Sequence, residues 1–147
     1  MFYIYVEDNK LNGCGQAQCL NEDIQNIEVS QEIYNTYAED NLRYIWSGTE
    51  IIENPDYEQQ AQQRETERVG ELTMTALDFI TFLRQCGLTL EQIRAYLNAN
   101  IELDTQLTYC QNVYCKVARA IMPITLDDIT ITAEMVEQAF KRKNGEE

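Results

Sequence analysis

The chain has no histidine, and its 147 residues include only two prolines and six glycines. Without histidine, the Ser–His and Cys–His pairs that activate a nucleophile cannot be built. Glycine-rich phosphate-binding or dinucleotide-binding patterns and the G-x-S-x-G turn of hydrolases are also missing. We therefore expect a protein that is not an enzyme, with no catalytic residues and no cofactor-binding residues.

Long apolar runs are missing as well. No stretch of about 18 apolar residues occurs, so the sequence predicts no transmembrane helix and no membrane partner. Residues 1–6 are apolar, but no basic residues precede them and Glu7 and Asp8 follow at once. This arrangement differs from a signal peptide, and we expect no export by one.

Basic residues are scarce. The chain has 11 Lys and Arg against 25 Asp and Glu, a net charge of −14. In residues 1–58, only Lys10 and Arg43 oppose twelve carboxylates, which leaves −10. A nucleic-acid backbone would be repelled, so we expect no direct nucleic-acid binding. The acidity serves either solubility or a basic partner.

The cysteines are odd in number, and no C-x-x-C occurs; they are Cys14, Cys19, Cys86, Cys110 and Cys115. We expect reduced thiols. Two C-x4-C spacings invite a four-cysteine zinc site. If Cys110 and Cys115 share a helix, however, five residues rotate the side chain by about 140°, and the two thiols face different ways. We expect no metal site.

The front of the chain shows strand patterns. Phe2, Ile4 and Val6 alternate with Tyr3 and Tyr5, which is typical of a half-buried strand. Further short strands are predicted at residues 16–20, 24–29, 42–46 and 50–52. A helix capped by Ser30 is predicted over residues 31–37.

From Asp56 onward, the pattern becomes helical. The predicted helices cover residues 57–72, 75–87, 89–97, 101–122 and 132–143. The first is polar on nearly every face, which is typical of a helix that bridges domains. The fourth carries apolar residues spaced 4, 3, 4, 3 and 4 apart between Leu103 and Ile121, a stripe that predicts a buried helix capped by Asn100.

These patterns predict an α+β fold, with a small antiparallel β-rich module at the N-terminus and a helical bundle at the C-terminus. The predicted domains are a β-rich module at 1–55, a polar connecting helix at 56–72 and a helical module at 73–147. The expected core of the helical module is Phe79, Ile80, Leu83, Ile93, Leu97, Leu107, Val113, Tyr114, Val117 and Ile121.

Aromatic residues gather in the acidic front half. Such residues suit both half-exposed strands and protein interfaces. The candidate interaction surface consists of Tyr3, Tyr5, Tyr34, Tyr37, Tyr44 and Trp46.

Two resemblances follow from local segments. Residues 82–94 resemble the helix-turn-helix stretch after the wing of MerR-type regulators, but the basic recognition helix and wing that should precede it are missing. The segment from Tyr44 to Tyr114 resembles small proteins encoded in the tail regions of bacteriophages and prophages. The residues that carry this second resemblance are Tyr44-Ile45-Trp46, Ile51-Ile52, residues 54–58, the polar helix, and the blocks 72–79 and 107–114.

The phage resemblance implies a tail or tail-fibre accessory role. The first hypothesis is therefore a non-enzymatic structural or assembly protein that acts through contacts with other phage or host proteins. It would be made in the cytoplasm of the bacterial host and could enter the virion tail; a homo-oligomer is compatible with it. The alternative is a phage-encoded acidic inhibitor of a host defence protein, which the −10 front half favours. A third hypothesis is a cytosolic helical adaptor of other origin.

Overall fold

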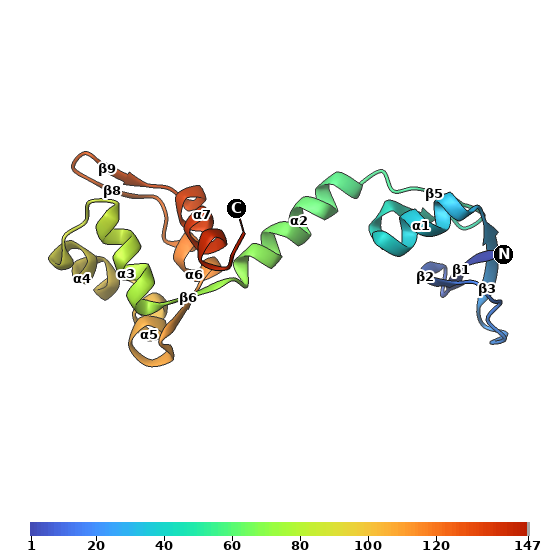
Figure 1. Ribbon diagram of the computed structural model, residues 1–147, viewed down its shortest axis with the longest axis horizontal. Coiled ribbons are helices and arrows are strands. Elements are labelled where there is room, and N and C mark those ends of the chain that lie inside the picture. The colour runs from blue at the N-terminus through green and yellow to red at the C-terminus, as the bar shows by residue number, and fades with distance from the viewer. Residues whose placement is uncertain (147) are drawn as a thin grey trace. The chain divides into compact units, whose positions relative to one another are not determined.

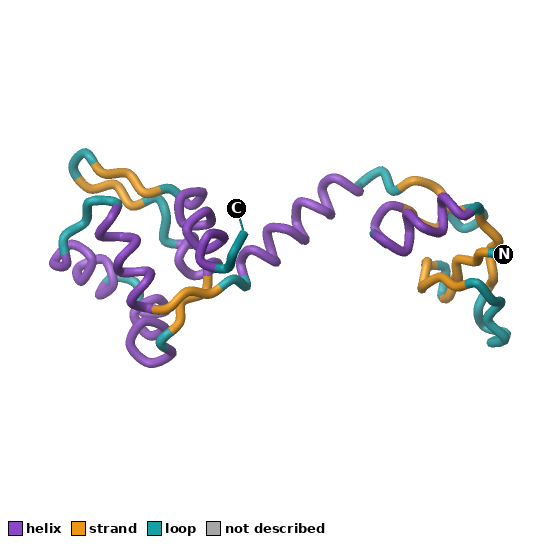
Figure 2. Tube along the Cα trace, viewed as in Figure 1, coloured by secondary structure: helices purple, strands orange, loops and turns teal. Residues whose placement is uncertain are grey.

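The computed structural model describes residues 1–146 and has an α+β fold (Figures 1 and 2). It divides into two compact units, the first spanning Met1–Gln63 and the second beginning at Arg64. The division falls inside helix α2 (Tyr57–Gly70), between the borders at 55/56 and 72/73 that the sequence suggests. Within the described part of the chain, no helix is long and apolar enough to cross a membrane.

The first unit is built on a three-stranded antiparallel sheet. Strand β1 (Phe2–Glu7) lies between β2 (Lys10–Gly15) and β3 (Gln25–Val29). The predicted alternation is confirmed in part: Ile4 and Val6 are buried and Tyr5 is partly exposed, but Tyr3 is buried as well and Phe2 is only partly buried. Helix α1 (Gln31–Glu39) contacts β1 and β2, and the Ser30 hydroxyl accepts the Ile33 N–H at its start, as expected.

The strand predicted at residues 16–20 is wrong, since this segment is irregular. Its polar backbone groups find side-chain partners instead of a neighbouring strand. Tyr5 donates its hydroxyl to the Ala17 carbonyl at 2.7 Å. The Asn26 side chain accepts the Cys19 N–H at 2.7 Å and donates to the Cys19 carbonyl at 2.9 Å.

Asn54 fastens the second hairpin of this unit to the start of α2. The hairpin pairs β4 (Tyr44–Trp46) with β5 (Ile51–Glu53), as the sequence predicts, after the short 3-10 turn η1 (Asn41–Arg43). Asn54 is only 7% exposed; its amide donates to the Leu42 carbonyl and to Gln60, and its oxygen accepts the Asp56 N–H. The buried amide is thus fully used, which fixes where the helix begins.

The second unit combines helices with two two-stranded antiparallel sheets, so it is not a pure helical bundle. Its strands are β6 (Thr73–Thr75) paired with β7 (Asn112–Tyr114), and β8 (Ile124–Leu126) paired with β9 (Ile129–Ile131). The second half of α2 belongs to this unit. Its other helical elements are α3 (Ala76–Gln85), α4 (Leu90–Asn98), α5 (Ile101–Thr105), the π-helical turn η2 (Gln106–Cys110), α6 (Cys115–Ala120) and α7 (Ala133–Lys143).

Three predicted helix starts are confirmed. Thr75 and Thr132 accept the backbone N–H of the third residue beyond them, at the starts of α3 and α7. Thr89 and Gln92 form a complete capping box at the start of α4. Asn100 does not cap α5; its amide instead donates to the Tyr96 carbonyl at 2.8 Å.

The predicted helix over residues 101–122 is wrong. Gln111 has a left-handed backbone with φ of 59°, which ends the π turn, and the chain then extends into β7. Val113 lies opposite Met74 in β6, and the pairing continues on both sides: the Ala76 N–H donates to the Gln111 carbonyl at 2.9 Å and the Cys115 N–H to the Leu72 carbonyl at 2.8 Å. Non-local strand pairing therefore overrides a local helical pattern.

The predicted core is confirmed in part. Five of its members are buried: Phe79, Leu83, Ile93, Val113 and Val117. Four pack against the core but are only partly buried: Ile80, Leu97, Leu107 and Ile121. Tyr114 is wrong, because it is 39% exposed on the outer side of β7. The core also contains residues that the predicted set lacks: Leu103, Ile124, Ile131, Val136 and Phe140.

We expect Leu103→Ala to destabilise the second unit by about 2–5 kcal/mol, because Leu103 is only 1% exposed and its truncation leaves a cavity. Leu107→Ala is the matched comparison: it removes the same atoms from a partly buried position and should cost less. Urea unfolding followed by helical circular dichroism measures both. Equal losses, or a larger loss for Leu107→Ala, would contradict the deeper burial of Leu103.

Candidate functional site

The six aromatic residues of the candidate interaction surface do not form one exposed patch. Tyr3 and Tyr37 are 5% and 4% exposed, so placing them on the surface was wrong. The Tyr37 hydroxyl accepts the Gly13 N–H at 3.2 Å, and the Tyr3 hydroxyl contacts the Met1 sulfur at 3.0 Å. Both rings are part of the packing of the first unit.

The other four, Tyr5, Tyr34, Tyr44 and Trp46, are partly exposed. Tyr34 stacks on Phe2 with ring centroids 4.9 Å apart. Tyr5 lies so close to Gly15 that a Cβ there would be 2.2 Å from its hydroxyl oxygen. Tyr5 and Tyr34 thus make contacts within the first unit, whereas Tyr44 and Trp46 on β4 stay candidates for an interaction surface.

The acidic character of the first unit lies at its surface. Of its twelve carboxylate residues, all but Glu7 and Asp40 are exposed. Its two basic residues do not form a counter-patch, because Arg43 stacks on the Tyr57 ring with its guanidinium carbon 4.0 Å from the ring centroid. This unit therefore presents a mainly acidic surface, with Lys10 and Arg43 as its exposed basic residues.

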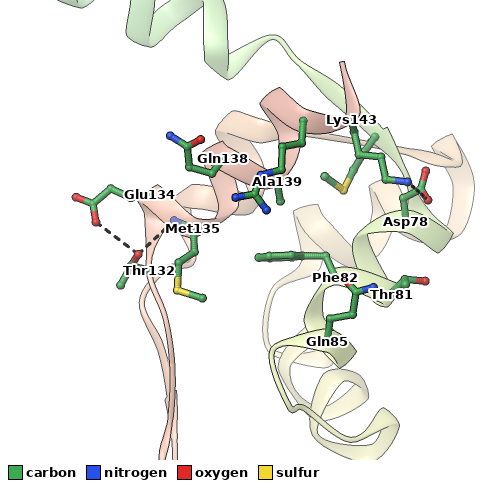
Figure 3. A pocket seen from close by; sticks show the side chains of 12 residues that line it. Asp78, Thr81, Phe82, Gln85, Thr132, Glu134, Met135, Gln138, Ala139 and Lys143 are labelled. Carbon is green, nitrogen blue, oxygen red and sulfur yellow. Dashed lines mark hydrogen bonds and ion pairs between the residues drawn. The ribbon is translucent and has the colours of Figure 1, made fainter. Parts of the chain in front are cut away.

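A groove of about 720 Å³ lies between α3 and α7 in the second unit (Figure 3). Phe82 of α3 points toward the space beside Met135 and Ala139 of α7. Met74 of β6, which is 4% exposed, also lines it. The Phe82 ring lies 6.4 Å from that of the fully buried Phe79, so the apolar floor continues into the core.

Charged side chains form the rim of the groove. Lys143 donates to Asp78 at 2.8 Å, and Thr75 donates to the same carboxylate at 2.9 Å. These two donors hold the pKa of Asp78 below its ordinary value. Asp78 is thus a paired, ionised rim group and is poorly suited to proton transfer near neutral pH.

Arg142 and Glu134 complete the rim at the two ends of α7. The Thr132 hydroxyl lies 3.5 Å from the Glu134 carboxylate. Within residues 1–146, Arg142 has no ion-pair or side-chain hydrogen-bond partner. The rim is therefore acidic where α7 begins and, as far as residues 1–146 show, carries an unpaired guanidinium where α7 ends.

A second apolar surface lies around the π-helical turn. Leu77 and Tyr109 are 74% and 81% exposed, and a hollow of about 360 Å³ is lined by Leu77, Leu107 and Cys110. π-helical turns recur at functional positions in proteins. Two apolar surfaces of the second unit thus remain open to solvent.

The sequence does not single out the groove. Phe82 has the spacing of a core residue on α3, and Met135 lies next to Val136 in a helix whose apolar residues are predicted to face the core. The available indication is that Met135 and Ala139, four residues apart, form an apolar row beside the buried row of Val136 and Phe140. That row gains meaning only once α3 is known to lie opposite.

The cysteines lie in different surroundings from those expected. Cys110 is exposed on the π turn and Cys115 is fully buried at the start of α6, so the two do not share a helix. No group of three or more Cys, Asp or Glu residues in the described chain is arranged to hold a metal ion. Burial raises the pKa of the Cys115 thiol to about 11.

In comparisons with known proteins, no family model, no curated protein and no solved structure matches the chain.

We predict that Cys110 is the first thiol to be alkylated in the native protein and that Cys115 resists until the unit unfolds. Cys110 is exposed, whereas Cys115 is 0% exposed and its raised pKa leaves little thiolate at pH 8. Iodoacetamide labelling followed by peptide mass spectrometry measures both rates, with the urea-unfolded chain as the control. Labelling of Cys115 at the rate of Cys110 in the native chain would contradict the packing of α6.

Proposed function

We propose that the protein is a non-enzymatic adaptor of a bacteriophage tail or its assembly, acting through protein–protein contacts. The observation that carries this proposal is the pair of open apolar surfaces on the second unit, above all the α3–α7 groove. Exposed apolar patches bordered by polar groups are typical of interaction sites. The first unit adds a surface of different character, dominated by carboxylates.

The ionisable groups support a binding role. Several acidic and basic residues with a shifted pKa belong to surface ion pairs, among them Glu65, Arg68, Asp78, Lys116 and Glu146. Each shift favours the charged form and has a named partner, such as Glu71 for Lys116 at 2.6 Å. A general acid or base usually shows the opposite tendency, toward the uncharged form or toward neutral pH.

The resemblance to phage tail-region proteins concerns segments that form paired strands within each unit. Blocks 72–79 and 107–114 contain β6 and β7, which pair with each other. The segments around Tyr44-Ile45-Trp46 and Ile51-Ile52 form the paired strands β4 and β5. The residues that carry the resemblance therefore belong to the structural framework of each unit.

The test is the fate of the tagged full-length chain in bacteria that carry the corresponding phage. We expect it to sediment with particles, tails or tail intermediates in a density gradient and to be detected there by mass spectrometry. Sedimentation only as the free chain, at every stage of particle assembly, would contradict the proposal.

A second candidate is an acidic inhibitor of a nucleic-acid-binding host protein, favoured by the ten exposed carboxylates of the first unit. Such binding would depend on charge, since exposed carboxylates act through electrostatics that salt screens. Washing the captured complexes at 0.05 M and 0.5 M salt distinguishes the two. We expect adaptor contacts through the apolar groove to persist, whereas loss of all partners at 0.5 M salt would favour the inhibitor.

A further inference from the structure

The α3–α7 groove has a more apolar lining than the fold of its own unit requires. On α7, Val136 and Phe140 are fully buried and complete the core. Met135, one residue away, is 41% exposed, and Ala139 is only partly buried. The helix thus carries a second apolar row that the unit itself leaves partly exposed.

The opposite wall repeats this arrangement. Phe79 and Leu83 of α3 are buried in the core, while Phe82 between them is only half-buried and lines the groove. Together with Met74 below, the walls offer an aromatic ring and two thioethers. Methionine side chains adapt their shape to what they contact, and they are common on surfaces that bind apolar helices.

Charge specifies the occupant further. Arg142 and Glu134 are eight residues apart on α7, about 12 Å at 1.5 Å per residue. Asp78 already neutralises Lys143, whereas Arg142 has no ion-pair partner in the described chain. A guanidinium has the geometry to bind a carboxylate with two parallel hydrogen bonds. The occupant should therefore place an acidic group at one end and a basic group near Glu134.

We propose that the α3–α7 groove is the docking site for an amphipathic helix of a partner protein, with its apolar row against Phe82 and Met135 and a carboxylate on Arg142. A groove walled by two helices, with an apolar floor and charged ends, suits a helix. This proposal rests on the adaptor function, because it names the chemistry of one of the adaptor's partners.

The four methionines supply a direct measurement. Met74 and Met135 line the groove, and Met1 and Met122 do not. In the full-length protein with ¹³C-labelled methionine methyl groups, we would titrate a synthetic 15-residue helical peptide. It carries leucines three and four residues apart and a Glu and a Lys eight positions apart at the ends of that row.

The expected result is a saturable shift of the Met74 and Met135 methyl signals, with those of Met1 and Met122 unchanged. Arg142→Glu should weaken the binding of the peptide by about tenfold or more, because a charge-assisted pair becomes a repulsive one. Arg84→Glu, which makes the same change of net charge on α3 outside the groove lining, should leave the affinity unchanged. A peptide with Lys in place of Glu should bind wild type as weakly as the original peptide binds Arg142→Glu.

Three outcomes of the methionine titration would overturn the docking proposal. The first is the absence of any shift of Met74 and Met135, and the second is an equal effect of Arg142→Glu and Arg84→Glu. The third is a shift of the groove methionines on raising the protein concentration alone, which would assign the groove to a second copy of the chain. The sedimentation test separates this proposal from the adaptor function. If the wild-type tagged chain sediments with tails and the Arg142→Glu variant does so equally well, the groove proposal fails and the adaptor function stands.

Discussion

The pairing of β6 with β7 is the constraint on which the second unit depends. It joins residues about forty positions apart in the chain, with Thr73 opposite Tyr114 and Thr75 opposite Asn112. The helices α3, α4 and α5 all lie within the loop that this pairing closes. Val113 and Met74, at its centre, are both buried, so the small sheet is also part of the core. Met74 lines the groove as well, which makes the strand pairing a support of the proposed docking site.

The elements of the fold that could be predicted from the sequence are those determined by neighbouring residues. The β4–β5 hairpin around Gly48 and the Thr89–Gln92 capping box follow from neighbouring residues and are confirmed, and the alternation of β1 is confirmed in part. The stretch from 101 to 122 also has a local helical pattern, but it competes with pairing to a strand that the local sequence does not reveal. Asn112, Val113 and Tyr114 alternate exposed, buried and exposed, which fits a short strand as well as it fits a helical stripe.

The candidate sites show the same limit. Aromatic content predicted a surface in the first unit, but Tyr3 and Tyr37 are buried because the sheet and α1 enclose them. A groove between two helices depends on which helix faces which, and this depends on the pairing of β6 with β7 and of β8 with β9, neither of which is evident as a pair in the sequence. Likewise, that Lys143 and not Arg142 pairs with Asp78, and that Arg142 has no ion-pair partner in the described residues, follows only from the tertiary structure. Composition and local pattern predicted the fold class, while the site needed the tertiary arrangement.

Amide hydrogen exchange of Met74 and Val113 in the intact chain tests this account most directly. Their pair lies between two hydrogen-bonded pairs, at Leu72–Cys115 and Ala76–Gln111, so the alternation of an antiparallel ladder makes it a hydrogen-bonded pair too. The account predicts that both amides exchange as slowly as those of the buried helices α3 and α7, through unfolding of the whole unit. Exchange of Val113 as fast as that of the exposed residues 16–18 would contradict it, since the strand pairing that frames the second unit would then not be a stable part of the fold.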